Sequence, residues 1–263
     1  MGEAGRLAGY DTVSTSLALC GDAELRELVD AAVPLGTGIG GKSARMDVAG
    51  TTVFVKRVPL TDLERRPEHL RSTANVFELP AFCQYGVGGP GFGAWREVAV
   101  HTMTTNWVLS GQFQGFPLTY HWRVLPDEAP TLAEELAHFE NVLTDGRRLY
   151  FADYGLALSS RFDLSPTETD FYDRHAGYDR CYTASYLVNW LVTALYGADW
   201  ETRGALIRAW AEGQQPTGAP PGTARILARH APVAAVMTDF YRTIQEVSRT
   251  TSYPAERLRR FCP

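Results

Sequence analysis

The sequence lacks long hydrophobic runs and closely spaced cysteine pairs, and only two of its 25 basic residues are lysines. Without an apolar run of about 18 residues, a membrane-spanning helix is not expected. The N-terminal residues also lack the apolar core of a secretion signal. Widely separated cysteines are typical of reduced thiols rather than of a disulfide framework; they are Cys20, Cys83, Cys181 and Cys262. We therefore expect a cytoplasmic protein without a membrane partner.

The chain also lacks a basic charge balance. Its formal net charge is −5 over 263 residues, and 45% of the residues are hydrophobic. Proteins that bind nucleic acids usually carry a concentrated positive charge, so the composition argues against a nucleic-acid partner. The length is sufficient for one large domain or two lobes with a substantial core.

The two lysines, Lys42 and Lys56, fall in one short segment. Because Lys is a compact charge on a thin and flexible stem, it suits a phosphate in a narrow cleft better than the broad Arg fork does. The segment begins with the glycine-rich stretch Gly36–Ser43 and continues into a β-branched, apolar strand expected at Thr51–Val58. A glycine-rich turn before such a strand allows backbone amides to surround a phosphate.

The glycine-rich stretch fits two known patterns. As G-x-x-x-x-G-K-S, with Gly36 first and Lys42 next to last, it matches the P-loop of NTPases. As G-x-G-x-x-G, with Gly36, Gly38 and Gly41, it matches the phosphate-covering loop of kinases. Both patterns predict a nucleotide-binding site, and they differ in the elements that must flank the glycines.

The flanking segments favour the second pattern. A P-loop lies between a strand and a helix, and the N-terminus of that helix holds the phosphate. Here the residues before the glycines, Glu24–Ala32, have a helical pattern, whereas Thr51–Val58 reads as a strand. The order of glycine-rich turn, strand and lysine is therefore the more consistent interpretation, and a P-loop NTPase remains a third alternative.

A second group of polar residues surrounds an expected β-hairpin. Asn141 and Asp153 belong to its two adjacent strands, twelve residues apart, and Thr144-Asp-Gly146 is a strong turn signal between them. An amide and a carboxylate on neighbouring strands provide the hard oxygen ligands that Mg²⁺ prefers, with the remaining ligands coming from phosphates and water. The sequence therefore predicts a shared magnesium site at Asn141 and Asp153.

Together these motifs resemble the protein-kinase-like superfamily, which includes aminoglycoside and other small-molecule phosphotransferases. The resemblance extends from Gly36 to Gly155, where Asp153-Tyr-Gly155 is similar to the kinase D-F-G motif. It implies an α+β fold with two lobes, in which residues 1–125 form a β-rich lobe and residues 126–263 form a helical lobe with the metal-binding hairpin.

The resemblance also implies roles for individual residues. Lys56 would contact the α- and β-phosphates of ATP, and Glu97, on an expected helix, would hold Lys56 in place. Leu125 would belong to the hinge that contacts adenine. Asn141 and Asp153 would bind Mg²⁺ between the protein and the phosphates.

The sequence departs from this family at the catalytic base. The family places an Asp five residues before the metal-binding Asn, and here that position is Leu136. Glu134, Glu135 and Glu140 are nearby carboxylates, and their spacing favours none of them. We therefore expect a protein that binds ATP and Mg²⁺ and transfers phosphoryl groups weakly to a hydroxyl on an unidentified small molecule or protein. The alternative is a catalytically inactive pseudokinase that acts as a binding or regulatory module.

The remaining pattern predicts several further elements. A strand is expected at Leu118–Val124, and helices are expected at Leu60–Leu70, Ala94–Leu109, Thr131–His138, Tyr178–Tyr196, Trp200–Glu212, Thr223–Arg229 and Val233–Ser248. The segment before Asn141 is too short for the two helices that the family places there. The apolar faces of the later helices must therefore close over the gap, or a second subunit in a homodimer must cover them.

Overall fold

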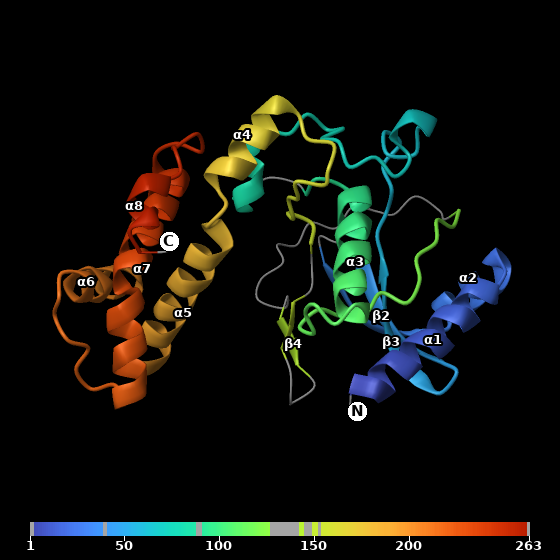
Figure 1. The fold of residues 1–263 in the computed structure, drawn as a ribbon, viewed down its shortest axis with the longest axis horizontal. Helices are drawn as coiled ribbons and strands as arrows, with labels where there is room; N and C mark the ends of the chain where they lie inside the picture. The colour runs from blue at the N-terminus through green and yellow to red at the C-terminus, as the bar shows by residue number, and fades with distance from the viewer. Residues whose placement is uncertain are drawn as a thin grey trace. The chain divides into compact units, whose positions relative to one another are not determined.

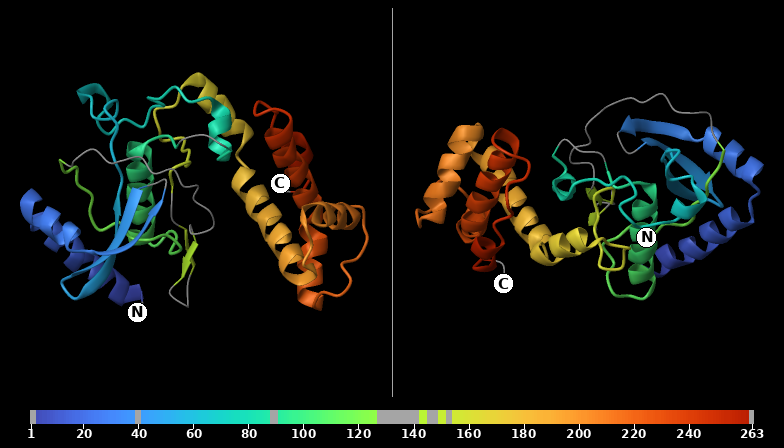
Figure 2. Two further views of the ribbon diagram at one scale, coloured as in Figure 1. Left: turned by 180° about the vertical axis from the view of Figure 1, so that it is seen from behind. Right: turned by 90° about the horizontal axis from the view of Figure 1, so that it is seen from above.

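The computed structural model describes residues 3–38, 41–87, 91–126, 142–144, 149–151 and 154–261. It is an α+β structure with a three-stranded antiparallel sheet and a separate two-stranded hairpin (Figures 1 and 2). This confirms the α+β class expected from the sequence. No helix in the described ranges combines the length and the apolar character needed to cross a membrane.

The chain divides into two compact units. The first contains Met1–Leu79 and Pro90–Asp163, and the second contains Pro80–Gly89 and Leu164–Pro263. A lobe boundary near Leu125 stays a prediction, because the residues that follow Pro126 lie outside the described ranges.

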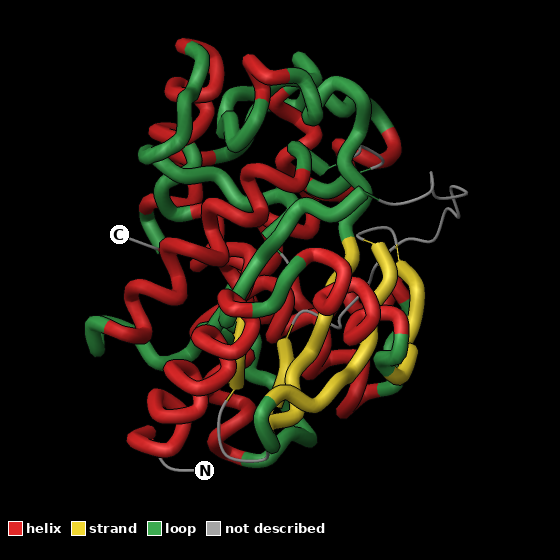
Figure 3. The backbone as a smooth tube through the Cα atoms, turned by 90° about the vertical axis from the view of Figure 1, so that its right-hand side faces the viewer, coloured by secondary structure: helices red, strands yellow, loops and turns green. Residues whose placement is uncertain are grey.

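The first unit is built on a sheet of three strands, β1 (Val33–Gly38), β2 (Gly41–Val48) and β3 (Thr51–Arg57), which pair in sequence order. Figure 3 draws the strands of the chain in yellow. The β-branched run from Thr51 forms β3, as predicted. A tight turn joins β2 to β3, because Gly50 adopts a positive φ of 76° and its N–H donates to Asp47 Oδ1 at 3.0 Å.

Two helices, α1 (Glu3–Leu19) and α2 (Asp22–Asp30), pack against one face of this sheet. The buried residues of this small core are Val13, Leu17, Leu25, Val48 and Val53. The sequence predicted α2 but not α1. Helix α1 presents Val13 and Leu17 one turn apart, so its burial rests on a narrow apolar stripe supported by the sheet.

Helix α3 (Ala94–Leu109) belongs to the same unit and has the predicted bounds. Side chains alternate between the two faces of a strand. Val53 of β3 is buried in the core with α1 and α2, so Lys56, three positions later, extends from the opposite face. There it reaches Glu97 of α3.

Two predicted elements of the first unit are wrong. Leu60–Leu70 is not a helix: it contains turns and a short 3₁₀ segment, η1 (Pro67–His69). Pro67 cannot donate a backbone hydrogen bond inside a helix. Leu118–Val124 is not a strand in the structure, because it pairs with none of the strands in the described ranges, and the N–H of Thr119 instead donates to Thr105 Oγ1 at 2.9 Å.

The predicted hairpin near Asn141 is confirmed in its described part. Strands β4 (Val142–Thr144) and β5 (Leu149–Phe151) are antiparallel, with Val142 opposite Phe151. The turn residues between them lie outside the described ranges, as does the expected helix at Thr131–His138.

The second unit is helical, and α5 and α7 run side by side in it (Figure 1). Its helices are α4 (Pro166–Arg174), α5 (Tyr178–Tyr196), α6 (Trp200–Ala211), α7 (Pro221–Glu246) and α8 (Ala255–Arg259). The predicted bounds of α5 are confirmed, and those of α6 differ by one residue. The buried core between α5, α6 and α7 consists of Val188, Val192, Ile207, Trp210, Leu227, Ala231 and Ala234.

Helix α7 corrects the prediction of two helices, because it continues through Pro232. A proline inside a helix loses one backbone hydrogen bond and crowds the preceding turn, at a cost of about 3 kcal/mol. The flanking residues Ala231 and Val233 are both buried. Packing on both sides of the proline therefore keeps the helix continuous where local propensity predicts a break.

An aromatic cluster in the second unit encloses His175. Its ring stacks on Phe171 at a centroid distance of 3.7 Å and on Tyr253 at 4.3 Å. The imidazole Nδ1 lies 2.6 Å from the carbonyl oxygen of Phe171, and Nε2 lies 2.6 Å from the hydroxyl of Tyr85 in η2 (Ala81–Tyr85). Burial lowers the pKa of His175 to about 4, although the hydrogen bond to the Phe171 carbonyl opposes the shift.

We expect acid to destabilise the protein through His175. Its folded pKa of about 4 is below the ordinary value of 6.5, so the unfolded chain takes up the proton first as the pH falls. Stability from the neutral ring is therefore present above pH 6.5 and is lost progressively toward pH 4. Urea unfolding from pH 7.5 to pH 4 measures this loss, and His175→Phe should flatten the dependence while keeping the stacking. An equal slope in both proteins would contradict the assignment.

Candidate functional site

The glycine-rich stretch forms the end of the β1–β2 hairpin. Gly36 lies opposite Ser43, and Gly38 lies opposite Gly41, with residues 39 and 40 outside the described ranges. The hydroxyl of Ser43 donates to the carbonyl oxygen of Gly36 at 3.2 Å. Because strand β2 follows these glycines, the P-loop interpretation lacks the helix that it requires.

The sheet register separates the two lysines. Ser43 lies opposite Lys56, and residues opposite each other in a sheet share a face. Lys42, one position before Ser43, therefore lies on the other face of the sheet from Lys56. Only Lys56 extends toward α3, so the two lysines that are neighbours in the sequence do not form one site.

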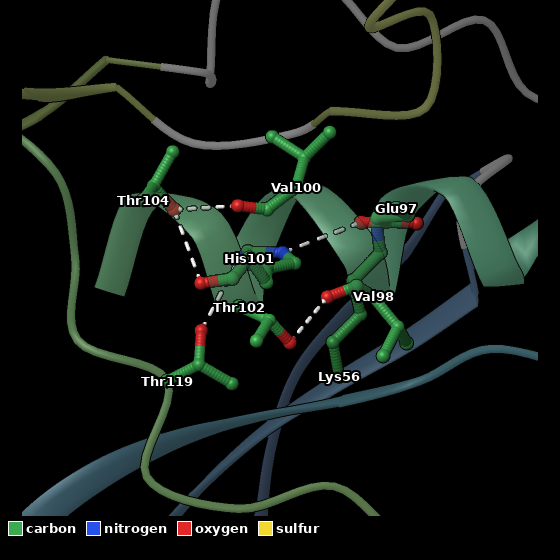
Figure 4. A network of polar contacts seen from close by, with 8 residues as sticks. All are labelled: Lys56, Glu97, Val98, Val100, His101, Thr102, Thr104 and Thr119. Carbon is green, nitrogen blue, oxygen red and sulfur yellow. Dashed lines mark hydrogen bonds and ion pairs between the residues drawn. The ribbon is translucent and has the colours of Figure 1, made fainter. Parts of the chain in front are cut away.

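Lys56 forms an ion pair with Glu97. Its Nζ lies 2.5 Å from Glu97 Oε1, and the side chains are 25% and 8% exposed, respectively (Figure 4). The contact that the sequence predicted between the strand lysine and the helix carboxylate is confirmed. Its role in nucleotide binding stays a prediction.

The surroundings of Glu97 keep its carboxylate ionised. Burial raises the pKa of this group, but the imidazole of His101 and the positive charge of Lys56 together outweigh burial, so the pKa is lower than its ordinary value. His101 lies one helical turn after Glu97, with its Nε2 3.7 Å from Glu97 Oε1. A charged carboxylate at this position holds the lysine in a fixed direction while leaving part of its ammonium accessible.

Glu64 fixes the beginning of α3 and was not found by sequence reasoning. This carboxylate is only 2% exposed, and its Oε1 accepts the N–H of Ala94, the first residue of α3, at 2.8 Å. Its Oε2 accepts the N–H and the hydroxyl of Thr61 at 2.9 and 2.8 Å. A negative charge at a helix N-terminus also interacts favourably with the positive end of the helix dipole. The spacing Thr61-x-x-Glu64 accounts for the local contact with Thr61, but it carries no information about α3, which begins thirty residues later.

Gly93 is required beside this carboxylate. Its φ is 98°, and a Cβ at this position would lie 2.7 Å from Glu64 Oε1. A side chain would therefore be strained in its backbone conformation and would also collide with the capping group. The absence of a side chain at Gly93 therefore makes room for Glu64 at the beginning of α3.

The segment that follows Asp153 also contacts α3. The ring of Tyr154 meets His101 edge-on at a centroid distance of 4.7 Å. The carbonyl oxygen of Gly155 accepts the N–H of Phe92 at 3.2 Å, just before α3 begins. Burial raises the pKa of Tyr154 to about 12, so its hydroxyl stays neutral. These contacts place the residue next to Asp153 against the helix that carries Glu97.

The remaining predicted site residues are not brought to the Lys56–Glu97 pair by any contact in the described ranges. Asn141 and Asp153 lie outside the described ranges, one and two residues beyond the paired positions Val142 and Phe151. Leu125 is partly buried and packs against the core formed by α1, α2 and the sheet. Within the described ranges, no three His, Cys, Asp or Glu side chains are grouped as metal ligands.

A cavity of about 280 Å³ lies beside α3, away from the ion pair. Its lining residues are Tyr10, Thr102, Thr105, Asn106, Thr119, Tyr120, His121 and Trp122. Lys56 and Glu97 do not line it, so this cavity does not support the nucleotide interpretation. Thr119 connects its wall to His101, because Thr119 Oγ1 lies 3.2 Å from His101 Nδ1.

Comparisons with known protein families, with curated proteins and with solved structures found no match to this chain. The functional interpretation therefore depends on the residues and their geometry.

We expect Glu64→Ala to destabilise the first unit by about 2 kcal/mol, because it removes a helix cap and leaves the buried N–H of Ala94 without its acceptor. Glu68→Ala is the matched control, since Glu68 is an exposed carboxylate four residues away. Urea unfolding measures both changes. A loss in Glu64→Ala no larger than in the control would contradict the capping role.

Proposed function

We propose that this protein is a kinase-like ATP- and Mg²⁺-binding protein that transfers a phosphoryl group to a hydroxyl acceptor at a low rate. The observation that carries the proposal is the ion pair between Lys56 and Glu97. A strand lysine held by a helix carboxylate, next to a glycine-rich hairpin, is the arrangement that positions nucleotide phosphates in protein kinases. The proposal includes a two-lobed kinase-like fold.

The predicted site residues in the described ranges would act as follows. Backbone amides at Gly36, Gly38 and Gly41 would face the phosphates, because glycines allow close approach of the backbone. Lys56 would contact the α- and β-phosphates while Glu97 keeps its direction fixed. Leu125 would lie at the adenine edge of the site.

Asn141 and Asp153 would hold Mg²⁺, and their amide and carboxylate oxygens are of the type that this ion prefers. Bound Mg²⁺ would neutralise the charge that develops on the phosphates during transfer. The contacts of Tyr154 and Gly155 with α3 and Phe92 support this assignment, since they bring the chain beside Asp153 to the helix of Glu97.

The low rate follows from the missing catalytic base. Leu136 occupies the position of the family Asp and cannot accept a proton from a hydroxyl acceptor. Phosphoryl transfer depends mainly on positioning and charge stabilisation, so weak transfer survives the loss of a base. The same residue favours the second candidate, a pseudokinase that binds nucleotide as a regulatory module. The acceptor is a hydroxyl-bearing small molecule or protein, and a homodimer remains part of the proposal.

We expect Lys56→Ala to weaken ATP·Mg²⁺ binding by more than tenfold, about 1.4 kcal/mol, because a charge-assisted phosphate contact is lost. Lys42→Ala is the matched control and should change the affinity less than about threefold, since Lys42 lies on the other face of the sheet. Isothermal titration calorimetry measures both affinities, with thermal unfolding to verify the fold. If the wild-type protein gives neither binding heat nor a thermal shift with ATP·Mg²⁺, the proposed function is wrong.

We expect Asp153→Ala to abolish the strengthening of ATP binding by Mg²⁺, with Asp163→Ala as the exposed control. Two protein oxygens are too few for an independent Mg²⁺ site, so the free wild-type protein should not bind the ion tightly. A phosphate-release assay should give turnover well below the range of about 1–100 s⁻¹ typical of kinases. Tight Mg²⁺ binding without nucleotide, or turnover in the ordinary range, would count against this assignment.

A further inference from the structure

His101 lies at the centre of a polar network on α3 (Figure 4). Its Nε2 is 3.7 Å from Glu97 Oε1, which is the same oxygen that Lys56 contacts at 2.5 Å. Its Nδ1 is 3.2 Å from the hydroxyl of Thr119, and its ring meets Tyr154 edge-on. One imidazole therefore contacts the ion pair, the segment that lines the cavity, and the residue after Asp153.

A neutral imidazole is compatible with the neighbours of both of its ring nitrogens at once. If the Thr119 hydroxyl donates to Nδ1, the ring proton resides on Nε2, which faces the carboxylate of Glu97. At 3.7 Å the neutral Nε2–H is too far from Glu97 Oε1 for a direct hydrogen bond, so the ring only lies beside the carboxylate, while Lys56 contacts the same oxygen at 2.5 Å. His101 in this form restricts the rotation of Glu97 and thereby the direction of Lys56.

A proton added to His101 would change the net charge of the network, whereas the neighbouring residues would stay the same. Among the described residues, the titratable groups beside His101 are Glu97 on α3 and Tyr154, and Lys56 on β3 contacts the same oxygen of Glu97. Glu97 stays ionised because its pKa is lowered, and Tyr154 stays neutral because burial raises its pKa to about 12. The group of Lys56, Glu97 and His101 therefore goes from a net charge of zero to +1 when His101 gains a proton.

We propose that His101 is a positioning residue for the Lys56–Glu97 pair and that its protonation tightens the binding of nucleotide phosphates. The inference rests on the nucleotide-binding function proposed above. The physical reason is that an imidazolium shares the carboxylate with Lys56, which leaves more of the ammonium charge available to a phosphate. One additional positive charge near a polyanion also strengthens its binding, by an amount that salt screening reduces.

The test is the pH dependence of ATP·Mg²⁺ affinity between pH 7.5 and pH 5.5 for the wild type and three variants. His101→Gln keeps polar contacts but cannot titrate, His101→Leu loses both contacts, and His121→Gln is the control on the cavity segment. The wild-type protein and the control should gain about three- to tenfold in affinity at pH 5.5 relative to His101→Gln. Because the nucleotide has the same protonation state in every measurement at one pH, the ratio of the variant and wild-type affinities cancels its contribution.

At pH 7.5 the variants separate positioning from charge. His101→Gln should retain the wild-type affinity within about threefold, whereas His101→Leu should lose more than that because Glu97 is no longer restrained. Identical pH profiles for the wild type and His101→Gln would overturn the inference while leaving the proposed function intact. Absence of ATP binding in every protein would overturn both.

A measurement without nucleotide provides an independent readout. NMR titration of the Glu97 carboxyl should give a higher pKa in His101→Leu than in the wild type, because the imidazole that lowers it is absent and no polar group replaces it. His101→Asn provides a second non-titrating variant if the glutamine variant does not fold. An unchanged pKa of Glu97 in a folded His101→Leu variant would show that His101 does not act on the pair.

Discussion

The buried carboxylate of Glu97 is the constraint on which the candidate site depends. A carboxylate that is withdrawn from water must be neutralised or paired, since an unpaired buried charge is strongly unfavourable. Lys56 supplies the pairing cation at 2.5 Å and thereby joins β3 to α3. This contact requires the two residues to meet although 41 positions separate them in the chain. The geometry of the first unit follows from that requirement.

Helix α3 receives contacts from chain segments on either side of it in the sequence. Glu64 fixes its N-terminus, and Thr119 contacts its middle through both Thr105 and His101. From a segment more than forty residues after the end of α3, Gly155 accepts the N–H of Phe92 just before the helix, and the ring of Tyr154 meets His101. Because these contacts are polar and directional, they determine the rotation of the helix as well as its position. The direction of Glu97 is therefore set by several segments together.

Sequence reasoning succeeded where local pattern and burial agree. The bounds of α3 and α5 and the strand character of Thr51–Val58 were predictable, because apolar periodicity and β-branched residues correspond to the faces that are buried. It failed at α7, where Pro232 predicts a break, and at Leu118–Val124, where alternating apolar residues predict a strand. In α7 the burial of the residues beside the proline compensates for the backbone hydrogen bond that the proline cannot make. In Leu118–Val124 the N–H of Thr119 donates to the Thr105 side chain instead of to a strand.

The sequence by itself determined the residue types of the candidate site: the glycine pattern, the single pair of lysines, the carboxylate on a helix and the absence of an Asp at Leu136. Tertiary structure decided which of these residues meet. Strand register placed Lys42 and Lys56 on opposite faces, so that only Lys56 contacts Glu97. Neither the capping role of Glu64 nor the central position of His101 was evident from sequence spacing. Such contacts join residues far apart in the chain, and local periodicity carries no information about long-range pairing.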